Sequence, residues 1–356
     1  MSKRIETEKK YFCANNEELI ELVNALKFKL ISSGVENDEY FTDINSEYIR
    51  SRTCLRIRKT NDEMQVTFKG KSKDFHNAFC KLESNYSVSK ESYDDFINLF
   101  SNLGYYTYTI VNKTRSTYQI KDKKYSYSIM VDTIEDLGGF VEFELICEDD
   151  NYDEYELRNK LNDFINKFSE LNLEEATLPY RDFVALKMYN EYKPKKEIKG
   201  IHLNIDSFLK KYEKDFYNYY KLILKGKINL QAFREDVYNV SEENKKKLDN
   251  YFDNLKIQDS KFIILFELLK QIKEKGLDIV LTTNCSKSFI NNLLLKVFKK
   301  NVVDRIIYLN NNKAIYNELK KYNIDLNNYF NISKLDLKNT NSLLLVIINN
   351  FDITSK

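Results

Sequence analysis

The chain has 356 residues, of which 42% are hydrophobic, and its 56 basic and 54 acidic side chains leave a formal net charge of +2. This near-neutral balance argues against general nucleic-acid binding or attachment to an anionic membrane surface, because both require an excess of basic residues. The length predicts two domains, and the hydrophobic content suffices to fill their cores.

Cysteine and histidine are sparse. The five cysteines form no CxxC pair, and the only two histidines are His76 and His202. These features predict free thiols in a reducing compartment and argue against a disulfide framework, a zinc site or a multi-histidine metal site. The chain has no run of about 18 apolar residues, and its opening segment MSKRIETEKK lacks the apolar core of a signal peptide. We therefore expect a cytoplasmic protein without a membrane partner.

From the start of the chain to about residue 147 the pattern is mostly of period two, which is typical of strands. The predicted strands span 3–13, 38–43, 53–59, 63–69, 78–88, 106–118, 125–132 and 139–147. Helical periodicity occurs at 15–28 and 89–103, and an acidic helix is predicted at 152–171. Eight mostly antiparallel strands with one polar and one apolar side predict an α+β domain, a closed barrel surrounded by helices.

The segment EYKPKKEIKG, residues 191–200, is polar and turn-prone and holds one of the two prolines. It marks the predicted boundary between a first domain over 1–190, a linker over 191–197 and a second domain over 198–356. Beyond it, a short apolar strand at 201–205 is followed by a long helical region. Helix and strand then alternate up to the apolar run SLLLVIINN. This order predicts an α/β, Rossmann-like domain with an open parallel sheet.

In the strands of the first domain, charged residues share one parity and hydrophobic residues share the other. In TCLRIRK, for example, Arg56 and Arg58 alternate with Leu55 and Ile57. The charged set comprises Glu6, Glu8, Lys10, Arg56, Arg58, Lys69, Lys81, Glu83, Lys113, Arg115, Asp132, Glu142 and Glu144. This parity either faces solvent around a filled barrel or lines the lumen of a hollow one. Three amphipathic helices need an apolar surface to pack on, which favours the charged lumen.

A charged lumen of this composition indicates its ligands. Carboxylates in such numbers repel one another unless a cation lies among them, and oxygen donors with scarce histidine suit Mg²⁺ or Mn²⁺. The lysines and arginines require an anion of several charges, and guanidinium groups match phosphate oxygens. A metal-bound triphosphate satisfies both requirements.

The motifs of the first domain occur in the order of a known family. IETEKK resembles an ExExK signature, DEYFTD a D-x-YFD segment, TCLRIRK an LRIR strand, VTFKGK a T-x-K strand and IVNKTRSTY a K-x-R strand. VDTIEDLGGFVEFEL is similar to the closing acidic stretch of that family. On these motifs the first 190 residues resemble the CYTH family. These are the triphosphate tunnel metalloenzymes, which include class IV adenylyl cyclases and thiamine- or inorganic triphosphatases.

The resemblance implies a role for each matching residue. The implied metal ligands, for Mg²⁺ or Mn²⁺, are Glu6, Glu8, Glu83, Asp132, Glu142 and Glu144. The implied phosphate contacts are Lys10, Arg56, Arg58, Lys69, Lys81, Lys113 and Arg115, and the implied catalytic residues are Glu6, Glu8 and Lys10. Asn85 departs from the pattern, because the family usually has a second carboxylate there, and this weakens the expected metal site. Tyr180 and Lys187 lie in a tail that resembles the segment partly closing the tunnel mouth. They could reach the ligand from there, but we expect them on the surface.

The resemblance leads us to expect metal-dependent hydrolysis of a small triphosphate: inorganic tripolyphosphate, thiamine triphosphate or a nucleoside triphosphate. A class IV adenylyl cyclase, which makes cyclic AMP from ATP, uses the same wall residues and is the alternative. A further alternative is a sensor that binds a polyphosphate or nucleotide without turnover, and the amide at Asn85 adds weight to it. In each case the expected partner is a small triphosphate or nucleotide.

The second domain resembles the haloacid dehalogenase-like superfamily. IKGIHLNIDSFL is similar to its first motif, with Asn204 in place of the nucleophilic aspartate and Asp206 as the second acid. IVLTTN resembles the second motif through Thr283, Lys313 is the candidate third-motif lysine, and Asn349 stands in the last motif, where acidic metal ligands are usual. Amides in place of carboxylates imply a catalytically inactive domain with a helical cap. We expect it to act as a scaffold, a homodimer surface or a regulator of access to the tunnel; an ordinary Rossmann-like domain is the alternative.

Overall fold

The structure is a computed structural model that describes residues 5–70, 83–122, 124–147, 153–204, 260–283, 302–309 and 315–354. The chain divides into two compact units, Met1–Lys187 and Met188–Lys356, which are described separately. The division falls within one continuous helix, α5 (Tyr180–Tyr192). The predicted boundaries at 190 and 197 stay a prediction. In the described part of the chain, no helix combines the length and the apolar character needed to span a lipid bilayer.

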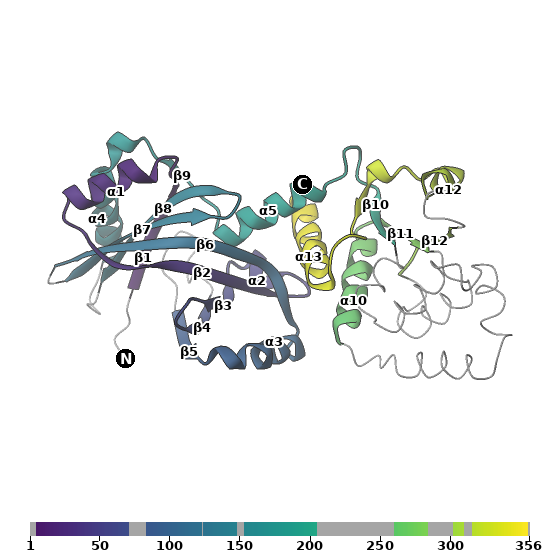
Figure 1. The fold of residues 1–356 in the computed structure, drawn as a ribbon, viewed down its shortest axis with the longest axis horizontal. Helices are drawn as coiled ribbons and strands as arrows, with labels where there is room; N and C mark the ends of the chain where they lie inside the picture. Colours follow the sequence, from purple (N-terminus) through teal and green to yellow (C-terminus); the bar gives the residue numbers. More distant parts are fainter. Residues whose placement is uncertain are drawn as a thin grey trace. The chain divides into compact units, whose positions relative to one another are not determined.

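Within the described residues, the first unit contains one antiparallel sheet of nine strands (Figure 1). The strands are β1 (Ile5–Phe12), β2 (Lys29–Asp43), β3 (Cys54–Lys59), β4 (Met64–Lys69), β5 (Glu83–Val88), β6 (Tyr105–Lys121), β7 (Tyr125–Ile134), β8 (Gly138–Cys147) and β9 (Glu174–Glu175). Their order across the sheet is β5-β4-β3-β2-β6-β7-β8-β1-β9. The long strands β2 and β6 pair from Lys29 to Asp43 and form the centre of the sheet.

The sheet curls around the charged side chains. Glu8 on β1 and Lys69 on β4 interact electrostatically, although five strands lie between β1 and β4 in the sheet order. Such an interaction requires the two halves of the sheet to face each other, as in a barrel. The structure thus has the predicted arrangement, with the charged parity inside a lumen and the hydrophobic parity outside.

Two details of the predicted barrel were wrong. We predicted eight strands in a closed cylinder, but within the described residues there are nine, and β5 and β9 are the edges of the sheet. The ninth strand has only two residues, which is too short to produce an alternation pattern. The strand predicted at 38–43 begins at Lys29 instead. Its first half is largely exposed and pairs with β6, so burial imposes no period-two pattern on it.

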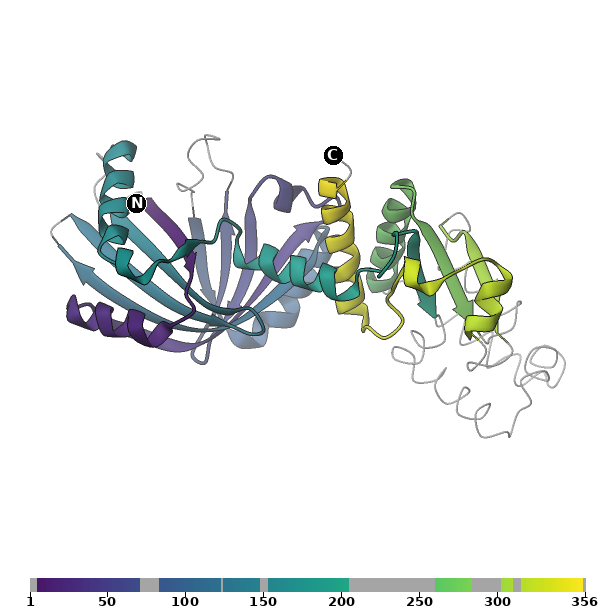
Figure 2. The ribbon, with the colours of Figure 1, turned by 90° about the horizontal axis from the view of Figure 1, so that it is seen from above.

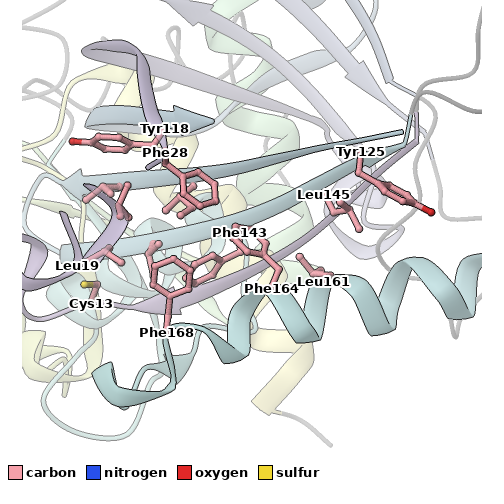
Figure 3. Close-up of a cluster of buried hydrophobic side chains, with 14 of the residues drawn as sticks. Cys13, Leu19, Phe28, Tyr118, Tyr125, Phe143, Leu145, Leu161, Phe164 and Phe168 are labelled. Carbon is pink, nitrogen blue, oxygen red and sulfur yellow. The ribbon is translucent and has the colours of Figure 1, made fainter. Parts of the chain in front are cut away.

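The outer face of the sheet is apolar and covered by helices. The first cluster of buried side chains joins β7 and β8 to α1 (Asn16–Ala25) and α4 (Glu154–Asn166). Phe143 on β8 meets Phe164 and Phe168 edge to face or tilted, with ring centroids 5.5 and 5.0 Å away (Figure 3). Asn15 caps α1 by accepting hydrogen bonds from the backbone N–H groups of Glu17 and Glu18.

A second apolar cluster lies under α3 (Tyr93–Asn102), where Phe100 packs on Phe41 of β2 and near Ile57 of β3. The remaining helical elements of this unit are short: α2 (Glu47–Arg50), η1 (Lys90–Ser92) and η2 (Ser169–Leu171). Each fully buried large apolar side chain contributes roughly 1.5–3 kcal/mol relative to exposure. The helices therefore fix the orientation of the sheet, with hydrophobic residues outward and charges inward.

Within the described residues, the second unit contains a parallel sheet in the order β12-β11-β10-β13. Its strands are β10 (Gly200–Asn204), β11 (Asp278–Thr283), β12 (Arg305–Tyr308) and β13 (Tyr329–Asn331). Its helices are α10 (Ser260–Glu274), α12 (Ile315–Lys321), η4 (Leu326–Asn328) and α13 (Leu337–Thr354). Figure 2 shows α10 and α13 side by side, and they are in contact. A parallel α/β sheet was predicted for this half.

The predicted haloacid dehalogenase-like motifs are not supported. SLLLVIINN lies inside α13, so Asn349 is in a helix and not at a strand end. Residues 343–348 are all buried, and a uniformly apolar run does not distinguish a strand from a buried helix by its period. Asn204 and Thr283 do end β10 and β11. Asp206, Lys313 and the predicted cap lie outside the described residues.

Candidate active site

The first group of charged side chains in the lumen surrounds Asp38. Arg58 donates to both oxygens of Asp38, from Nε at 2.6 Å and from Nη2 at 2.8 Å. Lys113 Nζ lies 3.4 Å and Arg56 Nη1 lies 3.6 Å from Oδ2 of the same carboxylate. Glu36 adds a second carboxylate to this group. The three strands β2, β3 and β6 thus bring three cations together around one buried aspartate.

The second group surrounds Arg115. Its Nε and Nη2 donate to the two oxygens of Asp132 at 2.7 and 2.5 Å, and Nη2 also donates to Glu142 at 2.6 Å. Lys10 Nζ lies 3.6 Å from the other oxygen of Glu142. The register explains the assembly, since Arg115 is opposite Asp132 between β6 and β7, and Lys10 is opposite Glu142 between β1 and β8.

Tyr180, at the start of α5, reaches into this second group. Its hydroxyl donates to Asp132 at 2.7 Å, and its ring lies 3.9 Å from Lys10 Nζ and 5.3 Å from Lys113 Nζ. The prediction that Tyr180 is a surface residue was wrong, because it is buried. Lys187 does lie nearer the surface, where it pairs with Asp136 at 2.7 Å.

The pKa shifts reflect these contacts. Burial opposes ionisation of Asp38 and Glu142, but neighbouring cations outweigh it and hold the pKa of both carboxyls well below the usual range. Burial, followed by repulsion from Arg115, lowers the pKa of Lys113. The opposite case is Glu8, whose pKa is raised by the charge of Glu142 and then by burial. Glu8 and Glu142 are therefore close enough to repel each other when both are ionised.

The structure brings together most of the predicted site residues that it describes. Glu8 and Glu144 are register partners on β1 and β8, and Lys69 interacts with Glu8 from β4. The backbones of Glu6 and Glu83 lie in β1 and β5, while their side chains lie outside the described part of the structure. Lys81 also lies outside the described residues. The catalytic, metal and phosphate roles assigned from the sequence stay predictions.

Three features of the site were missed by sequence reasoning. Asp38 and Glu36 share the inward parity of β2, so the alternation rule could have found them. Asn85, singled out for its missing charge, accepts a hydrogen bond from the hydroxyl of Thr67 at 2.7 Å, and Thr67 in turn accepts one from Arg56 at 3.2 Å. The amide thus helps to position Arg56.

The described carboxylates of the lumen can be compared with the ligands that a divalent ion requires. Within the described side chains, no three Asp, Glu, His or Cys residues converge into a metal-binding group. Glu8 and Glu142 nevertheless form a close pair of oxygen donors whose mutual repulsion a cation would relieve. Hard oxygen donors suit Mg²⁺ or Mn²⁺. These residues fit such an ion as part of a ligand set.

Known proteins and a family model match the N-terminal half of the chain. The family model of the CYTH domain matches residues 4–179. A Methanocaldococcus jannaschii protein named as a candidate adenylate cyclase is 26% identical over 183 residues, which are 51% of this chain and 98% of that protein.

Solved structures are similar over the same half. A protein from Pyrococcus horikoshii is 25% identical with a TM-score of 0.42 and covers 51% of this chain and 99% of its own. A candidate adenylyl cyclase from Hippeastrum, described as having a dominant triphosphatase activity, is 11% identical with a TM-score of 0.39, and covers 52% of this chain and 96% of its own. CYTH proteins include triphosphatases and adenylyl cyclases, and the N-terminal half of this chain, residues 4–179, is a CYTH domain.

Proposed function

We propose that the CYTH domain binds a small triphosphate together with Mg²⁺ or Mn²⁺ in its lumen and hydrolyses the terminal phosphoanhydride bond. The observation that carries this proposal is the grouping of cations in the lumen next to a pair of mutually repelling carboxylates. Arg56, Arg58 and Lys113 form one group of cations, and Lys10 and Arg115 belong to the other.

The cationic residues suit the oxygens of a polyphosphate. Arg58 and Arg115 present guanidinium forks, which match the spacing of two phosphate oxygens, and Lys113 and Lys10 add compact charges. Their positions on a rigid sheet hold them in place before the ligand arrives. Preorganised charges of this kind stabilise the charge that develops on phosphate oxygens during phosphoryl transfer.

The acidic residues suit the metal. Glu8 and Glu142 would hold it from the side of β1 and β8, and Glu144, the register partner of Glu8, is a further candidate. When bound, the divalent ion neutralises phosphate oxygens and lowers the pKa of a coordinated water. Lys10 lies beside Glu142, and so it is placed to contact a phosphate oxygen at the junction of the two groups.

Hydrolysis is preferred because it requires only water next to the terminal phosphorus. Cyclisation additionally requires a pocket that holds the base and turns the ribose 3′-hydroxyl towards the α-phosphorus. The name of the Methanocaldococcus jannaschii relative nevertheless favours a second candidate, an adenylyl cyclase acting on ATP in the same lumen.

A substrate panel separates these functions. The full chain is incubated with Mg²⁺ or Mn²⁺ and tripolyphosphate, thiamine triphosphate or ATP, and orthophosphate, pyrophosphate and cyclic AMP are measured together. Orthophosphate release supports hydrolysis, and equal amounts of cyclic AMP and pyrophosphate from ATP support cyclisation. Metal-dependent binding without any product indicates a sensor, and binding of none of the three ligands refutes a triphosphate site.

A further inference from the structure

The two charged groups of the lumen share one design, in which each contains an aspartate with no exposed surface and a glutamate that is less deeply buried. In the first group the side chain of Asp38 is 0% exposed and that of Glu36 is 16% exposed. In the second group the values are 0% for Asp132 and 9% for Glu142. In both groups the glutamate has the longer side chain and is the less deeply buried of the two carboxylates, although Glu142 is itself a buried residue.

Both glutamates bridge cations. Oε2 of Glu36 lies 3.1 Å from Arg58 Nη2 and 3.1 Å from Lys113 Nζ. Oε2 of Glu142 lies 2.6 Å from Arg115 Nη2, and its Oε1 lies 3.6 Å from Lys10 Nζ. These four cations are the groups to which the proposed function assigns phosphate oxygens. Each glutamate therefore occupies a place between two cations that a phosphate oxygen would take.

The two aspartates are held too firmly to be displaced. Asp38 accepts two hydrogen bonds from Arg58, and Asp132 accepts two from Arg115 and a third from Tyr180. Removing a buried carboxylate from its cations would leave uncompensated charges away from water, which is strongly unfavourable. The glutamates accept fewer hydrogen bonds from their neighbours, since Glu142 accepts one from Arg115 and Oε2 of Glu36 accepts none, so that a competing anion can replace them.

We propose that Glu36 and Glu142 are exchangeable counter-ions that hold the cations of the lumen until a triphosphate displaces them. Glu142, once it leaves Arg115 and Lys10, joins Glu8 as a ligand for the divalent ion. Triphosphate and metal therefore bind cooperatively, because each releases a group that the other uses. This inference rests on the proposed function and adds the way in which the site is loaded.

The first test measures binding of tripolyphosphate to the full chain by isothermal titration calorimetry with EDTA and then with Mg²⁺. Glu36→Gln and Glu142→Gln each keep the shape of the side chain and remove the competing charge. We expect both to bind tripolyphosphate on the order of tenfold more tightly than the wild type without metal, the size of a typical coupling between ligands. Glu175→Gln removes an exposed glutamate that pairs with Lys9 at 3.9 Å, and it controls for net charge.

The metal distinguishes the two glutamates. Glu142→Gln is expected to lose most of the gain in tripolyphosphate affinity that Mg²⁺ gives, whereas Glu36→Gln keeps it. A general change in lumen charge would affect the two variants alike. Circular dichroism and thermal unfolding establish that each variant is folded before it is compared.

A second measurement needs no variant. Sulfate is a tetrahedral dianion that chelates Mn²⁺ weakly, so a change in Mn²⁺ affinity on adding sulfate reports coupling through the protein. Free Mn²⁺ is counted by electron paramagnetic resonance in sulfate and in chloride at equal ionic strength. We expect sulfate to tighten Mn²⁺ binding several-fold in the wild type and in Glu36→Gln, and to have no such effect in Glu142→Gln.

The outcomes separate the inference from the function it rests on. If the wild type binds tripolyphosphate with Mg²⁺ but neither glutamine variant binds it more tightly without metal, the exchange is refuted and the triphosphate site stands. The same holds if sulfate leaves the wild-type Mn²⁺ affinity unchanged. If the wild type binds tripolyphosphate neither with nor without metal, both proposals fail.

Discussion

The hydroxyl of Tyr180 donates a hydrogen bond to Oδ2 of Asp132 over 2.7 Å. The same side chain covers Lys10 with its ring, and the ring packs edge to face on Phe140. Burial, together with the charges of Glu142 and Asp132, raises the pKa of Tyr180 well above its usual value. The hydroxyl is therefore protonated at neutral pH and acts as a donor. Through Asp132 it helps to hold Arg115, and so the first residue of α5 contributes to the order of the lumen.

Two substitutions separate the contributions of the hydroxyl and the ring. Tyr180→Phe keeps the ring and removes one donor to Asp132, which is worth about 1 kcal/mol, so we expect tripolyphosphate with Mg²⁺ to bind about fivefold more weakly. Tyr180→Leu also removes the ring over Lys10 and is expected to cost a further ~0.5–2 kcal/mol. Calorimetric titration measures both. Equal affinities of the Phe variant and the wild type would show that Asp132 does not need this donor.

Asp38 is expected to be essential for the fold of the first unit. Asp38→Asn would leave Arg56, Arg58 and Lys113 with one partly exposed carboxylate, and breaking such a buried cluster costs roughly 3–5 kcal/mol. Thermal unfolding followed by calorimetry should show a lower transition temperature for the first unit. Sulfate should raise that transition more in the variant than in the wild type, because the anion replaces the missing charge.

Asp62→Asn, in an exposed loop between β3 and β4, is the matched control and should unfold like the wild type. The low pKa of Asp38 also fixes the sign of the pH effect. Its stabilisation is present above the usual range for aspartate and is lost as pH falls through the depressed value. If Asp38→Asn unfolds at the wild-type temperature without sulfate, the role given to Asp38 is contradicted.

Neighbouring lysines on β1 offer a test of the lumen with little change in sequence. Lys10 faces Glu142 in the lumen, whereas Lys9 faces outward and lies 3.9 Å from the exposed Glu175. Lys10→Ala is expected to lower kcat/KM for the triphosphate roughly 10- to 100-fold, the effect of losing a charged contact to phosphate. Lys9→Ala should stay within about twofold, because exposed ion pairs contribute little. Similar losses in the two variants would refute the assignment of Lys10.

Which face of the first unit's sheet is charged and which is apolar could be predicted from the sequence, because the alternation of side chains along a strand is a local property. Arg115 and Asp132 were expected on the same side of the sheet from their spacing alone. That they pair with each other depends on the register of β6 and β7, which the sequence does not specify. For the same reason the sequence did not predict that the expected phosphate-binding cations contact the expected metal-binding carboxylates. Tyr180 was named as a residue that could reach the ligand but was expected on the surface, because it lies outside the strands, where the alternation rule does not apply.

The second unit was less predictable. Its strands β10 and β11 were expected because short apolar runs follow a proline-containing turn and a glycine. The run in α13 was matched to the last haloacid dehalogenase-like motif, because nothing in its composition separates a buried strand from a buried helix. Its helical state is decided by packing, since α13 is in contact with α10 and residues 343–348 are buried. Tertiary contacts of this kind are absent from any local pattern.

His202 provides a pH test of the second unit. It is 1% exposed on β10, and its Nε2 lies 3.0 Å from the hydroxyl of Thr282. Burial lowers the pKa of His202 to about 4, although Asn331 favours the charged form. As pH falls from 6.5 towards 4, the unfolded chain takes up a proton that the folded chain does not. The folded state therefore loses stability by at most about 1.4 kcal/mol per pH unit.

Hydrogen exchange of peptides from β10 and β11, corrected for intrinsic rates, measures this loss in the full chain. In the wild type, protection of these strands should fall steadily as pH falls from 6.5 to 4. His202→Gln, which has an uncharged side chain at every pH, should show a flatter dependence, while peptides from β7 and β8 in the first unit serve as the internal reference. If the variant and the wild type lose protection in parallel, His202 is not the group that titrates, because only its imidazole differs between the two chains.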